Sequence, residues 1–564
     1  RVWGHCRGGP AHVSGAAAYE AHVAPLLREA CLDCHAGSEP EAGLSLEPWS
    51  SGDVPDAGRL LEHELLWTKV AEFLDARAMP PEGMPAIAPE RIDAAVGWVR
   101  GALNAAREGV PPDPGRVTIR RLNRTEYANT VRDLFGVELD SERWLPRDAV
   151  GYGFDHIGDV LSMPPALLEK YVAAAEHVAD VAVVAVDVDA EPAVRKFPAS
   201  ALRASRGAPV RGAGRVLTTN ATLSTDVWVP VSGTYVLRTR AFGQQAGPDP
   251  ARIRLHAGRR TSDPIDVPAV EPTDYETRVR IEGPSRVRIG VSFINDYYRP
   301  KHPDPAQRDR NLFVQSLEIV GPLPGTIGPF PESHARIVTR VPDAEEDVER
   351  VAEAVLRPWM HRAYRRPPTE DELRRVAALV GAVVSEGERF ERGIQVALQA
   401  LLVSPHFLFR VELDADRGGA VEPVGEHALA SRLSYFLWSS TPDDALLEAA
   451  DEGTLRRDVD AHVTRMLDDP RASSLVTNFA RQWLQLPRLA ESAPDRKRFP
   501  SFDEGLRRSM AVETELLLRD VFLEDRSILS LLVSDYTWLD RRLAKHYGLL
   551  PAFDAAPAGT ARGR

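Results

Sequence analysis

Cys31-Leu32-Asp33-Cys34-His35 is the stretch that decides the fold of the N-terminal part of this 564-residue chain. Two thiols three residues apart, followed at once by an imidazole, suit covalent attachment of haem. The cysteines can form thioethers with the porphyrin vinyl groups, and the histidine can become an axial ligand of the iron. Such a haem needs a helical shell that excludes water. The motif therefore predicts a small all-α domain that is redox-active and matured outside the cytoplasm.

The second axial ligand is expected downstream of this motif. Met79 lies 44 residues after His35, and two prolines follow it directly. A methionine before prolines is held on a rigid, extended loop, which is a suitable way to present a thioether. A helix predicted over residues 89–103 offers apolar side chains that could pack on a porphyrin: Ile92, Val96 and Trp98.

Residues 19–105 resemble a small class I cytochrome c domain of the type found in planctomycetes. The resemblance is carried by Ala24-Pro25-Leu26-Leu27 before the cysteine motif, by Met79-Pro80-Pro81 and by the helix that contains Trp98. The resemblance therefore implies that residues 19–110 fold as a class I cytochrome c domain.

The same resemblance implies a cofactor, haem c, and its ligands. Cys31 and Cys34 would bind the haem covalently, His35 would be the proximal ligand of the iron and Met79 the distal ligand. Because methionine–histidine ligation raises the haem potential relative to two histidines, we expect a redox partner protein of fairly high potential.

Other interpretations of these residues stay open. Cys6, Cys31, Cys34 and His35 would make a chemically allowed zinc site if the glycine-rich N-terminus folded back over it. The two thiols could also form a redox dithiol, although no βαβ pattern surrounds them, and the motif can arise by chance. Three residues could replace Met79 as the distal ligand: Met84, His22 and His63.

The composition of the whole chain excludes several classes of protein. Hydrophobic residues make up 43%, charged residues 27%, and the net charge is -13, which argues against a nucleic-acid partner because such a partner requires a basic face. No apolar run approaches the roughly 18 residues of a membrane span, so no transmembrane segment is expected. Three cysteines are too few for a disulfide-stapled scaffold.

The sequence also leads to expectations about the two ends of the chain and about the location of the protein. The chain begins at Arg1 without a visible signal peptide and stops in an Ala/Gly/Arg tail, so we expect both ends to be truncated. Covalent haem is attached outside the cytoplasm. The expected location is therefore the periplasm or the cell surface.

Changes in composition and in hydrophobic period predict a multidomain fold. It comprises the small all-α class I cytochrome c domain, a short helical domain, a jelly-roll-like β-sandwich and then mainly α-helical domains. The predicted boundaries are 1–18 for a disordered tail, 19–110 for the cytochrome c domain, 117–180 for a helical domain, 197–322 for the sandwich, and 345–415 and 425–556 for two further helical domains, the last of them truncated.

Alternation with a period of two predicts the sandwich, and capping signals predict the helices around it. Asn123 with Glu126, and Thr369 with Glu372, form capping-box pairs that should begin two helices. Thr441 is expected to cap a third, with proline at its first position. Two apolar stripes are expected to face the helical core: Ile394, Leu398, Leu401 and Leu402, and Leu429, Leu433, Phe436 and Leu437.

Oxygen-bearing side chains stand at the ends of two predicted strands of the sandwich. Calcium takes six to eight oxygen ligands, so Asp296, Asp309 and Asn311 would supply part of a shell. Tyr297 and Tyr298 could stack on a sugar ring. The segment is similar to calcium-dependent carbohydrate-binding modules of the xylan-binding type, which implies Ca²⁺ as a cofactor and a polysaccharide as a partner. The open alternative is a structural β-domain in which these residues form turns.

The helical remainder carries motifs without recognisable chemistry. Arg121–Tyr127, Ser404–Arg410 and Arg432–Trp438 resemble a large planctomycete family in which a cytochrome module precedes domains of unknown function. No nucleophile elbow, P-loop or dinucleotide fingerprint is present.

Three side chains of this remainder could still have a role. Arg410 and Arg432 are either structural ion pairs or buried charges that await a carboxylate such as Glu412 or Asp443. His406 is either a ligand or base, or a satisfied core histidine.

Two functions follow as hypotheses. The first is an exported c-type haem protein that transfers one electron, as an oxidoreductase or an electron-transfer subunit, coupled to the binding or oxidative processing of a polysaccharide. The second is a cell-surface glycan-binding or scaffold protein in which the haem is a sensor or has no catalytic part.

Overall fold

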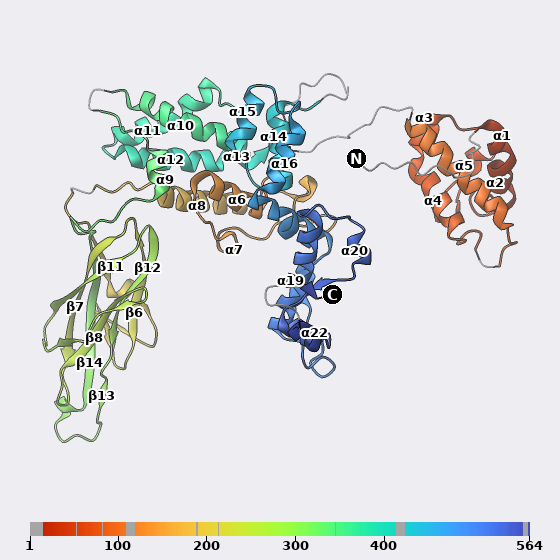
Figure 1. Ribbon diagram of the computed structural model, residues 1–564. Helices are drawn as coiled ribbons and strands as arrows, with labels where there is room; N and C mark the ends of the chain where they lie inside the picture. Colours follow the sequence, from red (N-terminus) through yellow and green to blue (C-terminus); the bar gives the residue numbers. More distant parts are fainter. Residues whose placement is uncertain are drawn as a thin grey trace. The chain divides into compact units, whose positions relative to one another are not determined.

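Two compact units divide the chain, Arg1–Arg116 and Val117–Arg564 (Figure 1). The computed structural model describes residues 15–51, 54–81, 83–108, 119–187, 190–212, 214–343, 346–412, 423–555 and 562–563. None of the described helices combines the length and the hydrophobicity that a membrane span requires.

The first unit is helical around an aromatic core. Trp49 packs on Trp67 with ring centroids 5.3 Å apart, and Tyr19 packs on Trp98 at 4.7 Å. All four side chains are buried, which secures the long last helix against the segments before it. The helices are α1 (Ala16–Ala18), a π-helical turn (Tyr19–Val23), α2 (Ala24–Ala30), α3 (Ala57–Glu62), α4 (Glu64–Asp75) and α5 (Pro89–Glu108), with 3₁₀ turns at Glu41–Gly43 and Glu47–Trp49.

Two boundaries of this unit differ from the sequence-based ones. Helical structure already begins at Ala16, and Ala18 is buried, so residues 16–18 belong to the helical unit rather than to a tail. The helix predicted to end at Leu103 continues to Glu108, because Ala106 still has apolar neighbours in the core. Cys6 and the rest of residues 1–14 lie outside the described residues.

In the second unit, helices on either side of the sandwich share one hydrophobic core. Helix α8 packs against α12, and Gln395 Nε2 on α12 donates to Val183 O, 2.7 Å away and 212 positions earlier in the chain. The short strands β1 (Arg120–Arg121) and β15 (Phe409–Arg410) pair antiparallel. The helices are α6 (Arg124–Phe135), α7 (Ser141–Trp144), α8 (Pro165–Ala182), α9 (Glu332–Ile337), α10 (Val348–Tyr364), α11 (Glu370–Ser385), α12 (Phe390–Val403) and α13 (Pro405–Leu408).

This shared core corrects the predicted domain plan. Residues 117–180 and 345–415 are not two separate helical bodies, because their buried side chains form one cluster. The sandwich is an insertion into that body, and Figure 1 shows α8 alongside α12 although the sandwich separates them in sequence. Sequence patterns could not show this, because each apolar stripe indicates that a partner exists but not which one.

Both predicted capping boxes are present. The Asn123 side chain accepts from Glu126 N at 2.8 Å, and the Glu126 carboxylate accepts from Asn123 N at 3.0 Å. The Thr369 and Glu372 pair makes the same reciprocal hydrogen bonds at the start of α11. Each box satisfies two backbone N–H groups that a helix start would otherwise leave without partners.

The predictions for the next helices need two corrections. Helix α15 begins at Asp444, and its cap is Asp443, whose carboxylate accepts from Leu446 N at 3.1 Å; Thr441 is not the cap. A carboxylate is at least as good a cap as a hydroxyl, and Arg465 and Arg471 hold it in place. Phe436, expected in the core, is 66% exposed, because α14 turns that side away from its apolar neighbours.

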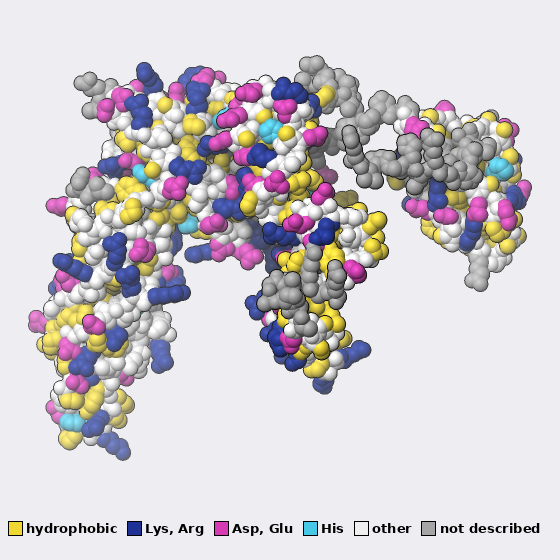
Figure 2. Space-filling view, in the orientation of Figure 1, with side chains coloured by type: hydrophobic (Ala, Val, Ile, Leu, Met, Phe, Trp, Pro, Cys, Tyr) yellow, Lys and Arg dark blue, Asp and Glu magenta, His cyan; other side chains and the backbone are white. Residues whose placement is uncertain are grey.

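The last helical part has its main hydrophobic cluster around Trp438. The Trp438 indole donates to Met466 O at 2.9 Å, and the Arg471 guanidinium lies 3.6 Å from the ring centroid. On this region of Figure 2, basic and acidic side chains are interspersed. The elements are α14 (Glu426–Leu437), α15 (Asp444–Asp451), α16 (Val459–Asp468), α17 (Arg481–Trp483), α18 (Pro487–Glu491), α19 (Glu504–Phe522), α20 (Ser530–Val533), α21 (Arg541–His546), α22 (Leu550–Ala555) and the pair β16 (Thr537–Trp538) and β17 (Arg562–Gly563).

The inserted region is a β-sandwich of two antiparallel sheets. One has the order β10-β8-β12-β6-β3, with β9 on β8, and the other the order β11-β7-β14-β5-β4, with β2 and β13 on β14. Alternate residues of both sheets, such as Leu237, Leu255 and Val291, form one core, as the period of two predicts. The strands are β2 (Val194–Pro198), β3 (Arg203–Ala204), β4 (Val210–Arg211), β5 (Gly214–Leu217), β6 (Thr222–Val229), β7 (Gly233–Gln244), β8 (Ala251–Ala257), β9 (Arg260–Thr261), β10 (Ile265–Val267), β11 (Thr273–Ile281), β12 (Ser285–Phe293), β13 (Tyr297–Tyr298) and β14 (Asp309–Val320).

Candidate functional site

Strand register brings the three predicted calcium ligands together at one end of the sandwich. In the β13–β14 pair, Tyr297 lies opposite Arg310 and Tyr298 opposite Asp309. Because side chains two residues apart on a strand share a face, Asp309 and Asn311 lie on the same side of the sheet. Asp296 directly precedes β13, and the Asp309 charge acts on its carboxyl.

Hydrogen bonds orient the central member of this cluster. Asn311 Nδ2 donates to Asp309 Oδ2 and to Gln244 Oε1, each at 3.0 Å. The other amide atom, Oδ1, is buried and has no hydrogen-bond partner among the described residues. Asp296 N donates to Asn220 Oδ1 at 2.8 Å, which anchors the loop that carries the Asp296 carboxylate. The cluster thus contains a buried oxygen acceptor without a donor.

Negative charge dominates the electrostatics of the cluster, and the positive charge of Arg310 offsets only part of it. Burial and the neighbouring Asp309 charge raise the pKa of the Asp296 carboxyl. In the described part of the chain, neither Asp296 nor Asp309 forms an ion pair with an arginine, lysine or histidine. Two adjacent carboxylates repel each other, and a bound cation would remove that repulsion.

The two neighbouring tyrosines differ in accessibility. Tyr297 lies between Arg310 and Arg299, whose guanidinium carbons are 5.3 Å and 5.8 Å from its ring centroid, and its ring also covers Gly247. Tyr298 is 67% exposed. Tyr298 is therefore the tyrosine that can offer an open ring face. Sequence reasoning did not identify Gln244 and Asn220, since only strand and loop pairing places them near the cluster.

In the first unit, the cysteine motif forms a turn that follows α2. His35 N donates to Cys31 O at 2.9 Å, and both cysteines are free thiols. Burial, with a smaller contribution from Cys34, raises the pKa of the half-buried Cys31 thiol to about 11; Cys34 is exposed. His35 Nδ1 lies 3.2 Å from Leu44 O, so this nitrogen donates to the carbonyl and leaves Nε2 free to act as a ligand.

Other features of this unit bear on whether haem c fits there. Met79 lies on the loop after α4, is 36% exposed and donates its backbone N–H to Phe73 O. The indole N–H of the fully buried Trp67 has no acceptor among the described residues. Large apolar side chains are exposed on α4 and the following loop: Leu65, Phe73, Met79 and Met84. Two thiols, an oriented imidazole and exposed apolar side chains are compatible with a covalently held porphyrin.

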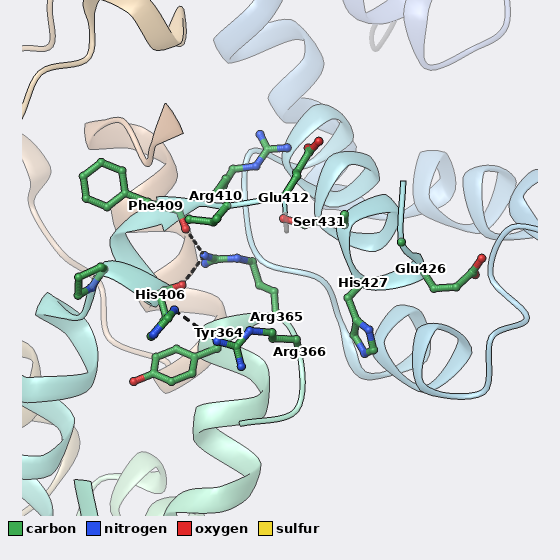
Figure 3. A pocket seen from close by; sticks show the side chains of 14 residues that line it. Tyr364, Arg365, Arg366, His406, Phe409, Arg410, Glu412, Glu426, His427 and Ser431 are labelled. Carbon is green, nitrogen blue, oxygen red and sulfur yellow. Dashed lines mark hydrogen bonds between the residues drawn. The ribbon is translucent and has the colours of Figure 1, made fainter. Parts of the chain in front are cut away.

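The helical body of the second unit contains a cavity of about 300 Å³. Figure 3 shows Arg365 and His406 on one side of it, and Glu426 and His427 from α14 on the other. Arg365 is not free to bind a ligand, because its guanidinium donates to the backbone carbonyls of His406, Phe407 and Phe409.

The three side chains singled out in the helical part have structural partners there. Arg432 Nε donates to Glu412 Oε1 at 2.7 Å, which is one of the two carboxylates considered from the sequence. His406 Nε2 lies 3.1 Å from Glu372 Oε1, and the imidazole is half exposed, so it is not a core histidine. Burial lowers the pKa of Arg410 to about 10, and its guanidinium lies over the Tyr435 ring.

Four family models match parts of the chain. Three describe proteins of unknown function: PSD3 (DUF1587) matches residues 120–184, PSD5 (DUF1595) residues 351–412 and PSD4 (DUF1592) residues 424–549. The fourth, CBM60, is described as a Ca-dependent, xylan-binding carbohydrate-binding module and matches residues 236–326. The predicted similarity of the sandwich to such modules is confirmed, as is that of the helical parts to families of unknown function. None of the four models covers the Cys31–His35 motif, and the cytochrome c domain stays a prediction.

Several solved carbohydrate-binding modules are similar to part of this chain. A CBM36 domain of a xylanase from the hindgut metagenome of Trinervitermes trinervoides is 16% identical, with 23% of this chain and 98% of that one covered and a TM-score of 0.19. A family 35 module from Clostridium thermocellum is 12% identical, with 22% of this chain and 97% of that one covered and a TM-score of 0.18. A CBM36 module in complex with calcium and xylotriose is 18% identical, with 22% of this chain and 98% of that one covered and a TM-score of 0.18. No curated protein matches the chain.

Proposed function

We propose that the β-sandwich binds a polysaccharide through a calcium ion held by Asp296, Asp309 and Asn311. The observation that carries this proposal is the buried Asn311 Oδ1, which has no donor among the described residues. The same amide is hydrogen-bonded to Asp309, whose negative charge also acts on Asp296. A buried acceptor without a partner is costly, and carboxylate and amide oxygens are the ligands that calcium prefers. The match of residues 236–326 to a Ca-dependent module supports the same assignment.

The site leaves coordination positions for the ligand itself. Calcium takes about six to eight oxygens, and these three side chains supply fewer than that. Asp296 and Tyr298 are exposed, so the open side of the ion would face solvent. Sugar hydroxyls can fill those positions, while the free face of Tyr298 stacks on a pyranose ring.

Binding of the full chain to insoluble xylan, with and without Ca²⁺, tests this function. We expect retention with Ca²⁺ and its loss with a chelator, and at least a tenfold weaker retention for Asp309→Asn and Asp296→Asn. Both substitutions keep the size of the side chain and remove a negative oxygen ligand. Isothermal titration with xylo-oligosaccharides would give the affinities.

Glu271→Gln is the matched control for these substitutions. Glu271 is an exposed acidic residue of the same sandwich, outside the cluster. Its removal should leave Ca²⁺-dependent retention unchanged. Retention that persists in the chelator, or that the two aspartate variants do not affect, would exclude a calcium-mediated site at this place.

A second candidate function is one-electron transfer by haem c in the first unit. The observation that favours it is the hydrogen bond from His35 Nδ1 to Leu44 O, because ligating histidines usually donate their second ring nitrogen in this way. Cys31 and Cys34 would hold the haem and His35 would ligate its iron. A bound haem would supply a one-electron couple.

Met79→Ala tests the distal ligand once the chain is expressed with a cytochrome c maturation system. We expect haem to stay covalently attached, as a denatured pyridine–haem spectrum would report, and the weak methionine–iron charge-transfer band to disappear. Met84→Ala serves as the control and should leave the band in place. Persistence of the band in Met79→Ala would exclude Met79, and absence of covalent haem from the unsubstituted chain would exclude this function.

Both candidate functions point to the same location. Polysaccharides of the xylan type and the attachment of haem c are both found outside the cytoplasm. We therefore propose that the protein acts in the periplasm or at the cell surface, with a redox partner protein only if the haem is present.

A further inference from the structure

Two imidazoles and a carboxylate from three different helices converge in the second unit. His361 lies on α10, His427 is in the first turn of α14, and Asp451 is the last residue of α15. One ligand atom of each lies within 4.8 Å of the other two. No second group of three His, Cys, Asp or Glu side chains with this spacing occurs in the ranges that the structure describes.

The distances within this triad are those of ligands around one metal ion. His427 Nε2 is 2.8 Å from Asp451 Oδ1, and His361 Nε2 is 3.4 Å from Asp451 Oδ2. Ligands about 2.0 Å from a tetrahedral zinc ion lie roughly 3.3 Å from one another. The observed separations lie on either side of that value, so small side-chain movements would suffice to bind an ion.

One imidazole has a nitrogen without a hydrogen-bond partner. His361 Nε2 is buried, its contact with Asp451 lacks hydrogen-bond geometry, and no other described residue pairs with it. A buried polar atom normally has a partner. A metal ion would give this nitrogen the partner that it lacks.

The surroundings of the triad are compatible with a cation. Arg362, the basic residue next to His361, is held by Asp444 through two hydrogen bonds of 2.7 Å, which compensates its charge. Asp451 lies at the C-terminal end of α15, where the helix dipole favours positive charge. All three ligands come from helices rather than loops, so their backbone positions are set by the packing of the core.

We infer that His361, His427 and Asp451 form a binding site for a divalent transition-metal ion of the zinc type. Two imidazole nitrogens and one carboxylate oxygen favour such an ion over Ca²⁺ or Mg²⁺, which prefer oxygen alone. The three side chains are between a quarter and about a third exposed, so water can complete the coordination shell. Three protein ligands with an open position are typical of zinc sites that activate water.

The site would also join two parts of the chain. His361 lies within residues 351–412 and the other two ligands within residues 424–549, which two separate family models match. His427 lines the cavity of Figure 3 as well, so the ion would lie at the edge of that cavity. This inference is independent of the proposed glycan site and of the haem.

Metal binding to the purified full chain tests the inference. After removal of metals, we expect equilibrium dialysis with Zn²⁺ to give one more bound equivalent for the unsubstituted chain than for His361→Ala or Asp451→Asn. With Co²⁺ as the probe, this equivalent should show a ligand-field band in the visible spectrum that both variants lack. The N-terminal cysteines are present in the unsubstituted chain and in both variants, so metal bound to them does not contribute to the difference in bound equivalents.

His546→Ala is the control, since His546 is an exposed histidine on α21 of the same unit, and it should bind as much metal as the unsubstituted chain. Zn²⁺ should also raise the melting temperature of the unsubstituted chain but not that of Asp451→Asn. The amide in Asp451→Asn can still accept from His427, so this variant should fold even if His361→Ala does not. Equal Zn²⁺ binding by the unsubstituted chain and Asp451→Asn would overturn the inference.

Discussion

Replacing Arg121 by alanine is expected to lower the free energy of unfolding of the second unit by about 3–5 kcal/mol, the range found when one partner of a buried ion pair is removed. Arg121 Nη2 lies 2.7 Å from Asp148 Oδ1, and both side chains are almost fully buried. Its guanidinium also donates to Ser162 O and Leu122 O. Without Arg121, the Asp148 charge stays in the core without its counter-charge, and Ser162 O loses a donor, whereas Leu122 O still accepts from the Tyr171 hydroxyl.

Urea unfolding followed by tryptophan fluorescence would measure this loss, with Arg357→Ala as the matched control. Arg357 forms an ion pair of the same length with Glu370, but both side chains are about half exposed or more. Its removal should cost less than about 1 kcal/mol. The double variant Arg121→Ala/Asp148→Ala should lose less than the sum of the two single variants, since no unpaired charge stays buried. Equal losses for Arg121→Ala and Arg357→Ala would contradict the prediction.

Acid is expected to weaken the helical body through Glu372. Two hydrogen bonds from Arg366, at 2.8 Å and 3.0 Å, and one from Thr369 N lower the pKa of this carboxyl from 4.5 to about 2. A carboxyl with a depressed pKa in the folded state stabilises it fully above its unfolded pKa. That stabilisation, about 3 kcal/mol, should therefore be lost as the pH falls from about 4.5 towards 2.

Unfolding midpoints of the unsubstituted chain and of Glu372→Gln, measured from pH 7 to pH 2.5, would test this loss. The variant should be less stable at pH 7, and the difference should shrink below pH 4.5, where the Glu372 carboxyl of the unfolded chain takes up a proton while that of the folded chain stays charged until about pH 2. Glu388→Gln, at an exposed position two residues before α12, should show no such change. If the difference in stability between the two chains stays constant from pH 7 to pH 2.5, the effect of Glu372→Gln does not come from the charge of the carboxyl.

Local chemistry explains which parts of the structure could be predicted. Asn123 and Glu126 are close enough in sequence for their hydrogen bonds to depend on the helix start alone, so the capping box was predictable. The same holds for the alternation that buries Leu237 and Leu255 in the sandwich. The calcium candidates stood out because Asp and Asn occur together where strands end, although it is the pairing of β13 with β14 that brings the Asp296 segment to Asp309.

Features that depend on distant partners could not be predicted. The core shared by α8 and α12 and the pairing of Arg121 with Phe409 join segments that lie on either side of the sandwich. His361, His427 and Asp451 are single residues on three helices, and no spacing relates them in sequence. Phe436 shows the opposite failure: its position in an apolar stripe indicated burial, but tertiary packing left it exposed.

The insertion of the sandwich into the helical body has a consequence for synthesis. Helix α8 leaves the ribosome long before α12, so the part of its apolar face that packs on α12 stays uncovered while the whole sandwich is being made. Contacts between such distant segments form slowly, and uncovered apolar surface favours aggregation. We expect the nascent chain to depend on chaperones during this interval, and the sandwich to complete its folding before the body that surrounds it in sequence.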